Sequence, residues 1–376
     1  MTFLPSVGSS IAAAAAHYTS ARIWISLIDE NRCSLPPPMT LPAARSFPLT
    51  ADLSICRILN GLWQVSGAHG RIDPARAVAA MFGYHEAGFT TWDLADHYGP
   101  AEDFIGAFRR QFAARHGEER LAEIQAFTKW VPSPGPMTRR VVEDAVGVSL
   151  RRMDTPCLDL LQFHWWDYGD ARYLDALKHL ADLRDEGKIR HVALTNFDTA
   201  RLAVIAERGI SVVANQVQYS LVDRRPASLM AAWCAEHGMS LLAYGTLLGG
   251  LLSDRYLGRP EPGRGELTTA SLGKYKQMID AWGGWALFQE LLAALRQVAD
   301  RHGISIANIG TSYMLDQQAV AGVIVGARLG VAEHIADNAR TFAVALDAAD
   351  LAEIETVLAK SRDLMTVIGD CGDEYR

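Results

Sequence analysis

The sequence lacks the features of secreted, membrane-spanning and nucleic-acid-binding proteins. Its five cysteines are odd in number and none are closely spaced, which argues against a disulfide framework and against a CxxC zinc site. No apolar run approaches the ~20 residues of a membrane helix. The net charge of −7 is of the wrong sign for a phosphate-backbone partner. We therefore expect a cytoplasmic protein without membrane or nucleic-acid partners, and the sequence indicates no oligomeric state.

Two common cofactor motifs are also missing. No GxGxxG occurs, so a classical dinucleotide fold is unsupported. The histidines form no HExxH or HxxxH pair, and we predict no metal site. The composition is instead that of an ordinary globular protein, with 49% hydrophobic and 21% charged residues in 376. This length suits one large α/β domain with an extension.

The N-terminal region differs in composition from the rest of the chain. Residues 9–16 are almost all small, and the first basic residue is Arg22, which fits a secretory signal poorly. Met39 offers a second translation start. Organelle targeting by this region is the alternative to a cytoplasmic location. The predicted organisation is a disordered extension over 1–48, a catalytic domain over 49–365 and a C-terminal tail over 366–376.

From about residue 50 onward, short apolar runs alternate with segments of helical period. Helices are expected over 74–87 and 101–115, near Thr138, Tyr173, Thr199, Pro226 and Trp285, and over 350–360. Eight such units favour a closed parallel (β/α)8 barrel, and a doubly wound open sheet is the alternative. The predicted strands are Ile58–Gln64, Thr90–Ala95, Ile124–Trp130, Leu158–Trp165, His191–Thr195, Val212–Tyr219, Leu241–Gly245 and Val323–Gly326.

Four ionisable residues fall at or just beyond the ends of three neighbouring strands, where barrel enzymes place their chemistry. They are Asp93, Tyr98, Lys129 and His164. A tyrosine has an ordinary pKa of about 10, and a nearby ammonium group favours its ionised form. A carboxylate can hold the lysine, and a histidine can orient a substrate oxygen. Together these groups make a proton-transfer device.

Each of the four residues also has an ordinary structural interpretation. Tyr98 alone is typical of a half-buried phenol, and Lys129 of a solvent-facing cation. His164 could be a core histidine, and Asp93 a helix cap. Only their joint arrangement at successive strand ends favours the functional interpretation.

The same residues carry a resemblance to the aldo-keto reductase superfamily. Asp93 to Gly99 reads DLADHYG and is followed by Ala101-Glu102, while TK at 128–129 and QFH at 162–164 match the next two strands. The resemblance extends from about 58 to 342 and implies an NADP-dependent (β/α)8 barrel oxidoreductase. It implies that Tyr98 is the general acid, tuned by Lys129 and Asp93, and that His164 orients the carbonyl.

The resemblance also implies a nicotinamide site. Thr195-Asn196 is similar to the family's Ser-Asn pair on the carboxamide, and Gln216 to the glutamine that completes this contact. Tyr244 corresponds to the aromatic residue that stacks on the nicotinamide. The residues Gly245, Thr246 and Leu247 would pass beside the pyrophosphate. As alternatives, Asn196 could cap the following helix and Tyr244 could belong to the core.

The adenine end of the cofactor is expected after the last strand. Gly326 and Arg328 precede a predicted helix, whose N-terminus favours a phosphate. The Arg328 guanidinium suits a 2′-phosphate, which predicts NADPH rather than NADH. Asp337-Asn338 resembles the family's Glu-Asn pair beside the adenine. His334 replaces a second arginine of many members, so NAD remains possible.

Tryptophans at predicted strand ends suggest an aromatic opening over the nicotinamide. Trp63, Trp130 and Trp165 are the predicted substrate-binding residues, with Trp166 beside them. The long Gly- and Pro-containing segment 252–284 is expected to be a substrate loop or lid. We expect reduction of an aldehyde or ketone to an alcohol. The alternatives are an NAD-linked sugar dehydrogenase and a cofactor-sensing auxiliary subunit with little turnover.

Overall fold

The computed structural model describes residues 45–375 except 68, 69 and 71. The predictions for residues 1–44, including the disordered extension and the alternative start at Met39, lie outside the described residues. Among the residues it does describe, no helix is both long and apolar enough to cross a bilayer.

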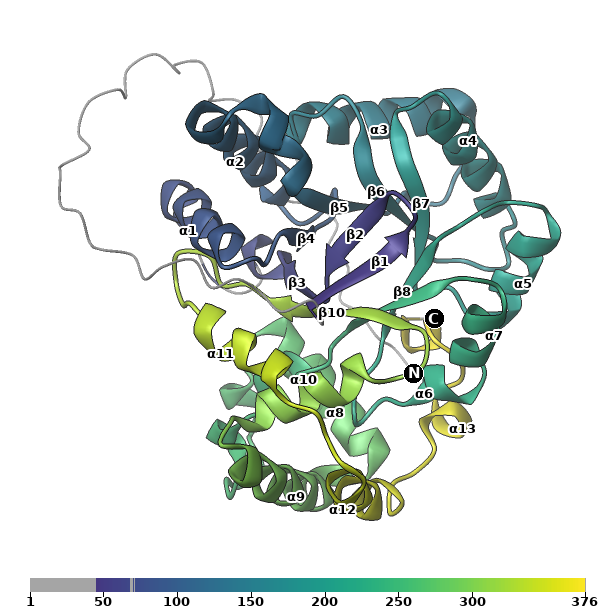
Figure 1. The fold of residues 1–376 in the computed structure, drawn as a ribbon. Coiled ribbons are helices and arrows are strands. Elements are labelled where there is room, and N and C mark those ends of the chain that lie inside the picture. The colour runs from purple at the N-terminus through teal and green to yellow at the C-terminus, as the bar shows by residue number, and fades with distance from the viewer. Residues whose placement is uncertain (1–44, 68–69, 71, 376) are drawn as a thin grey trace. The chain divides into compact units, whose positions relative to one another are not determined.

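The described chain contains a closed barrel of eight strands in the order β10-β3-β4-β5-β6-β7-β8-β9 (Figure 1). Every neighbouring pair in this barrel is parallel. The predicted (β/α)8 fold is therefore confirmed, and the open-sheet alternative is wrong. The strands are β3 (Ile58–Gly61), β4 (Thr91–Asp93), β5 (Gln125–Trp130), β6 (Leu158–His164), β7 (Ile189–Thr195), β8 (Ala214–Gln218), β9 (Ser240–Tyr244) and β10 (Val320–Gly326).

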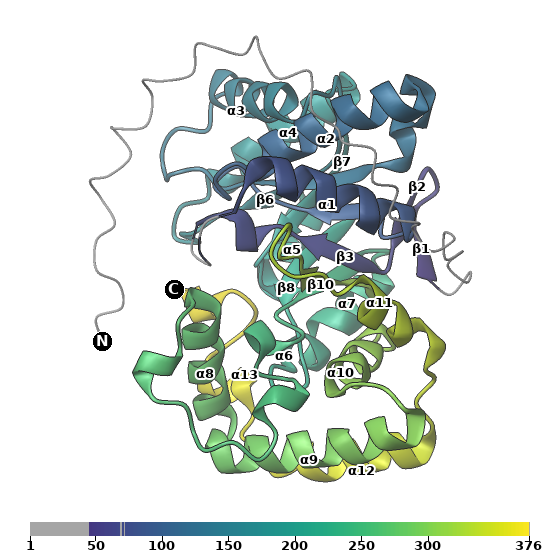
Figure 2. The same ribbon diagram turned by 90° about the vertical axis from the view of Figure 1, so that its left-hand side faces the viewer.

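Helices lie around the strands, as Figures 1 and 2 show. Local caps explain where several begin: the Asp73 side chain accepts from the Arg76 N–H at the start of α1, and Thr138 accepts from Val141 at the start of α3. The helices are α1 (Pro74–Glu86), α2 (Ala101–His116), α3 (Arg139–Arg152), α4 (Tyr173–Asp185), α5 (Thr199–Glu207), α6 (Arg225–Ser228), α7 (Met230–Glu236), α8 (Ala270–Trp282), α9 (Gly284–His302), α10 (Ile306–Leu315), α11 (Ile335–Arg340), α12 (Ala348–Leu358) and α13 (Leu364–Val367).

An antiparallel hairpin precedes the barrel and was not predicted. Strands β1 (Ser46–Thr50) and β2 (Leu53–Cys56) pair with each other and span the expected domain boundary at residue 48. Their apolar side chains pack into the barrel interior, against residues such as Phe127 and Leu160. The Nε2 atom of His191, near the start of β7, lies 2.9 Å from Oδ1 of Asp52 in the hairpin turn. The hairpin therefore covers the N-terminal end of the barrel (Figure 1).

The barrel interior changes from apolar to polar along the strands. Near the hairpin, inward positions belong to a buried apolar cluster. Two residues further along the strands, on the same face because side chains alternate, the interior becomes polar. The apolar members are Phe127, Leu160, Ala193, Ala214 and Leu242, and the polar residues two positions later are Lys129, Gln162, Thr195, Gln216 and Tyr244. The fold thus gathers polar groups at the C-terminal ends of the strands.

The long segment after β9 is partly helical. Its second half forms α8, whose cap Thr269 accepts from the Leu272 N–H. The helix buries Tyr275, Met278, Ile279 and Trp282 on one face, a helical period within the segment that we expected to be a loop. The predicted substrate loop is therefore an irregular first half followed by a packed helix.

We expect Leu53→Ala to destabilise the protein because the Leu53 side chain is buried where the hairpin enters the barrel. The loss should be about 2–5 kcal/mol of unfolding free energy, measured by urea unfolding followed by circular dichroism. The neighbouring Ser54 is exposed, so Ser54→Ala should change stability by less than about 0.5 kcal/mol. Equal unfolding midpoints for both variants would contradict the view that packing of the hairpin against the barrel stabilises the protein.

Candidate active site

A buried ion pair lies at the centre of the polar end of the barrel. The Lys129 Nζ atom donates to both carboxylate oxygens of Asp93 at 2.8 Å and to the Leu94 carbonyl at 2.9 Å. Asp93 and Lys129 are 3% and 2% exposed. Burial lowers the pKa of the Lys129 ammonium, and the attraction of Asp93 opposes this shift. The structure therefore places these two predicted residues in direct contact.

Two glutamine side chains complete the surroundings of the Asp93 carboxylate. Gln162 Nε2 donates to Asp93 Oδ1 at 3.0 Å, and Gln216 Nε2 donates to the same oxygen at 2.6 Å. Gln216 also donates to Gln162 Oε1 at 2.6 Å. Gln216 was predicted to contact the cofactor, but here its amide nitrogen supports the ion pair. Gln162 was not predicted, although its position two residues before His164 already places it on the same strand face.

Tyr98 lies directly beside this ion pair, on the turn that follows β4. The Lys129 Nζ atom is 5.0 Å from the centroid of the Tyr98 ring. Trp63 packs edge-on against that ring at 4.9 Å, and His97 at 4.8 Å. His97 Nδ1 lies 2.8 Å from Asp96 Oδ1. Tyr98, Lys129 and Asp93 are thus brought together, with Trp63 next to the phenol.

An arginine from α3 holds the Tyr98 turn from outside the barrel. Arg152 donates to the carbonyls of Asp96 and Gly99, on either side of Tyr98, at 3.0 and 2.5 Å. Arg152 Nη1 also donates to Glu102 Oε2 at 2.9 Å, and the other carboxylate oxygen of Glu102 accepts from the Thr128 hydroxyl. Burial raises the pKa of the Glu102 carboxyl, and these partners oppose the shift. No local sequence pattern indicates this contact, because fifty residues separate Arg152 from Glu102.

His164 ends β6 and is buried on the inward face. The ring centroid of Trp166, a residue with 41% exposure, lies 4.3 Å from the His164 ring. Trp165 is fully buried in the outer core, and its indole N–H donates to the Asp167 and Asp170 carbonyls. Trp165 is therefore corrected from a substrate contact to a core residue, because successive residues along a strand face opposite sides. Trp166 instead lies on the side of His164.

Trp130 follows the same rule of alternation. Lys129 points into the barrel, so the next residue points outward, and the Trp130 ring lies 5.4 Å from Phe163 in the outer core. This side chain is buried among apolar groups. Trp130 is thus corrected from a substrate contact to a core residue.

The ends of β7, β8 and β9 place three predicted nicotinamide contacts side by side. Asn196 has a left-handed backbone with φ of 59°, and its N–H donates to the Gln216 carbonyl at 2.9 Å. The Tyr244 hydroxyl donates to Asn196 Oδ1 at 2.9 Å. Asp198, rather than Asn196, caps α5. Within the described residues, the buried Thr195 hydroxyl has no hydrogen-bond partner, so a polar ligand could satisfy it.

The turn after Tyr244 is narrow. Gly245 has φ of 74°, and a Cβ atom there would lie 2.6 Å from the Tyr275 hydroxyl of α8. Thr246 is buried and donates to the Tyr219 carbonyl. Leu247 is partly buried against the outer core. Glycine alone fits the first of these positions without backbone strain and without displacing the Tyr275 ring.

The end of β10 differs from expectation. After Gly326, the exposed Arg328 begins a turn in which its carbonyl accepts from Val331 and Ala332. The predicted helix does follow, but α11 begins only at Ile335, so Arg328 itself does not lie at a helix N-terminus. A Cβ atom at Gly326 would lie 2.2 Å from the Gln64 amide nitrogen. The Gln64 amide therefore packs directly on the Gly326 backbone, and Arg328 provides a cation two residues further along the chain.

Asp337 and Asn338 lie on the short helix α11. Asp337 Oδ2 accepts from the Ser305 hydroxyl at 3.4 Å, and the Asp337 carbonyl accepts from Asn308. The Asn338 N–H donates to the His334 carbonyl. The structure thus places both predicted adenine contacts beside the start of α10.

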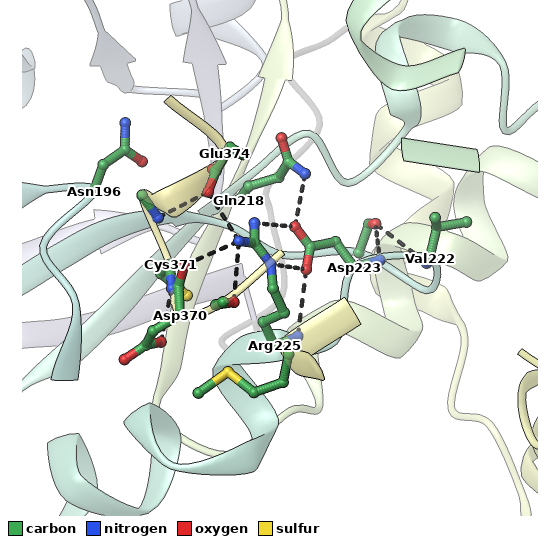
Figure 3. A network of polar contacts seen from close by, with 12 residues as sticks. Asn196, Gln218, Val222, Asp223, Arg225, Asp370, Cys371 and Glu374 are labelled. Atoms are coloured by element: carbon green, nitrogen blue, oxygen red, sulfur yellow. Dashed lines mark hydrogen bonds and ion pairs between the residues drawn. The ribbon is translucent and has the colours of Figure 1, made fainter. Parts of the chain in front are cut away.

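The predicted C-terminal tail is anchored to the barrel by Arg225 (Figure 3). The fully buried Arg225 guanidinium pairs with Asp223 at 2.7 Å and with Glu374 at 2.9 Å. It also donates to the Asp370 carbonyl at 3.0 Å. Gln218, at the end of β8, donates to Asp223 at 2.6 Å. Residues 369–374 therefore belong to the packed domain.

Replacing Asp93 should test the ion pair directly. Asp93→Asn leaves the Lys129 ammonium buried without an anion, so we expect a loss of about 3–5 kcal/mol in unfolding free energy. The double variant Asp93→Asn with Lys129→Met removes the unpaired charge and should recover most of that loss. Urea unfolding measures both, and a single variant as stable as the native protein would contradict the assignment.

Sequence comparison relates the whole barrel to known proteins. Residues 57–359 match the profile of the Aldo/keto reductase family. Flagellar radial spoke protein 5 of Chlamydomonas reinhardtii is 29% identical over 258 residues, 59% of this chain and 49% of that protein. The chain thus spans about half the length of that relative. L-glyceraldehyde 3-phosphate reductase of Escherichia coli O157:H7 is 25% identical over 318 residues, 80% of this chain and 88% of the relative.

Solved structures agree on the fold. An aldo/keto reductase from Klebsiella pneumoniae, in complex with NADP and acetate, superposes with a TM-score of 0.63 at 22% identity. The superposition covers 84% of this chain and 95% of that structure. With the profile matching most of its length, the chain belongs to the aldo/keto reductase family of oxidoreductases.

Proposed function

We propose that this protein reduces an aldehyde or ketone to an alcohol with NADPH. The observation that carries the proposal is the buried Asp93–Lys129 ion pair, whose ammonium lies 5.0 Å from the Tyr98 ring centroid. A desolvated cation beside a phenol favours the phenolate. Such a phenol can give a proton to a carbonyl oxygen as that oxygen gains negative charge.

Each side chain of the site has one role in the proposed reaction. A bound reduced nicotinamide would supply the hydride. The Tyr98 hydroxyl donates the proton to the carbonyl oxygen, and Lys129 stabilises the charge left on Tyr98. Asp93 and the two glutamines keep the Lys129 ammonium in place. His164, at the end of the next strand, orients the carbonyl oxygen by a hydrogen bond.

Several residues fit a nicotinamide cofactor. The buried Thr195 hydroxyl without a partner in the described chain and the neighbouring Asn196 suit an amide group, and the Tyr244 ring offers a stacking surface. At the other end, the Gln64 amide packs directly on the Gly326 backbone. The exposed Arg328 suits a 2′-phosphate. The Klebsiella pneumoniae structure, which is similar in fold, contains NADP.

The half-buried Trp63 and the exposed Trp166 support a substrate with an apolar or aromatic body. Trp63 adjoins Tyr98, and Trp166 adjoins His164, so each lies beside one of the residues proposed to contact the carbonyl oxygen. Aromatic walls favour flat or apolar groups over strongly hydrated ones. A cytoplasmic location remains our proposal for where this reaction takes place.

The function can be tested with Tyr98→Phe. Loss of the proton donor should lower kcat by roughly 10²–10⁴-fold, while the variant retains the fold and the cofactor contacts. The measurement is steady-state NADPH oxidation with 4-nitrobenzaldehyde, with NADPH binding measured by fluorescence as the control. Unchanged turnover would refute Tyr98 as the acid. Negligible turnover in the native protein despite tight NADPH binding would favour the cofactor-sensing subunit.

Arg328→Ala should test the cofactor preference. If Arg328 contacts the 2′-phosphate, its loss should raise KM for NADPH by roughly 10–100-fold, the equivalent of one charge-assisted hydrogen bond. KM for NADH should stay within about twofold, since NADH has no 2′-phosphate. An unchanged ratio of the two KM values would reject Arg328. A native preference for NAD+ with sugar oxidation would favour the dehydrogenase alternative.

A further inference from the structure

Helix α8 lies directly on the turn that follows Tyr244. A Cβ atom at Gly245 would meet the Tyr275 ring at 2.6–2.9 Å, and one at Gly249 would meet Ser271 and Tyr275 at 3.0–3.1 Å. Both glycines have positive φ, 74° and 67°. The backbone of the turn is therefore in close contact with Ser271 and the Tyr275 ring, so the first turns of α8 form part of the surface beside the turn.

This surface matters for the proposed cofactor. If the nicotinamide stacks on Tyr244, the adjoining phosphates pass close to the turn over 245–250. That turn reads GTLLGG and contains no ionisable side chain. Two phosphate charges in a partly buried channel require compensation by backbone N–H groups or by a cation. Any cation that contributes to this compensation must come from another element.

Lys274 on α8 is placed to provide it. Its Nζ atom lies 5.1 Å from the centroid of the Tyr244 ring and 5.4 Å from that of the Tyr275 ring. The side chain is partly exposed, and its four-carbon stem allows the ammonium to move between neighbouring positions. We propose that Lys274 binds the phosphate on the nicotinamide side of the cofactor, so that α8 closes one side of the cofactor site. This inference rests on the function proposed above.

The position of the helix is fixed by a different lysine. Lys276 pairs with Glu261 at 2.5 Å and with Asp280 at 2.6 Å. Its side chain is buried, with two anions in contact, so its charge is already compensated. Lys276 thus joins the irregular half of the segment to α8, while Lys274, two residues earlier, is directed toward Tyr244. The two lysines have separate tasks on one helix.

The experiment is calorimetric binding of NADPH, NADH and 2′,5′-ADP to the full-length protein. Lys274→Met should raise the dissociation constants for NADPH and NADH by a similar factor, roughly 10–100-fold, because both dinucleotides contain the nicotinamide-side phosphate. Binding of 2′,5′-ADP, which lacks that phosphate, should change by less than about twofold. Lys274→Arg retains the charge and should keep binding within about threefold of the native protein.

Lys360→Met is the matched control. Lys360 is an exposed lysine paired with Glu290, so its loss removes one charge without touching the turn, and all three dissociation constants should be unchanged. Lys274→Met with native affinity for NADPH and NADH would overturn the inference. An equal loss for 2′,5′-ADP would also overturn it, since the lysine would then act at the adenine end.

Failure of the proposed function has a different signature. If the native protein binds neither dinucleotide, both the function and this inference are refuted. Suppose instead that the native protein binds both dinucleotides and that Arg328→Ala lowers the affinity for NADPH. If Lys274→Met then leaves every affinity unchanged, only the inference about Lys274 is wrong. Thermal unfolding of each variant, followed by circular dichroism, confirms that the affinities refer to folded protein.

Discussion

The site depends on one electrostatic constraint: an ammonium group kept charged where water is excluded. Lys129 is stable there only because Asp93 contacts it with both oxygens and two glutamines fix the carboxylate. A buried charge without such partners would cost several kcal/mol. The four residues come from β4, β5, β6 and β8, so the closed barrel itself is needed to bring them together.

Closure of the barrel also explains how local sequence patterns predict which polar residues lie close together. The polar residues fall at strand ends, and parallel strands bring those ends to one rim. The proximity of Asp93, Tyr98 and Lys129 could therefore be predicted before any coordinates. The tryptophans could not be assigned by strand position alone, because Trp165 and Trp166 differ only in the side they face. Alternation from His164 would have separated them.

Other features depend on contacts that the sequence does not display. The Arg152–Glu102 pair joins α3 to α2, and nothing near either residue indicates the partner. Helix α10 is buried on nearly every side, so it lacks the one-sided apolar period by which helices are recognised. The hairpin strands are short and precede the first barrel strand without a helix. Helix α8 was obscured by the glycines and prolines around it.

The hairpin limits how the buried ion pair can exchange protons with solvent. Because β1 and β2 fill the N-terminal end of the barrel with apolar side chains, bulk water has no polar route to Lys129 from that direction. Protons exchanged between the ion pair and solvent must therefore use the C-terminal end of the barrel, where Tyr98 and His164 lie. A molecule bound at that end would separate the ion pair from solvent for as long as it remains.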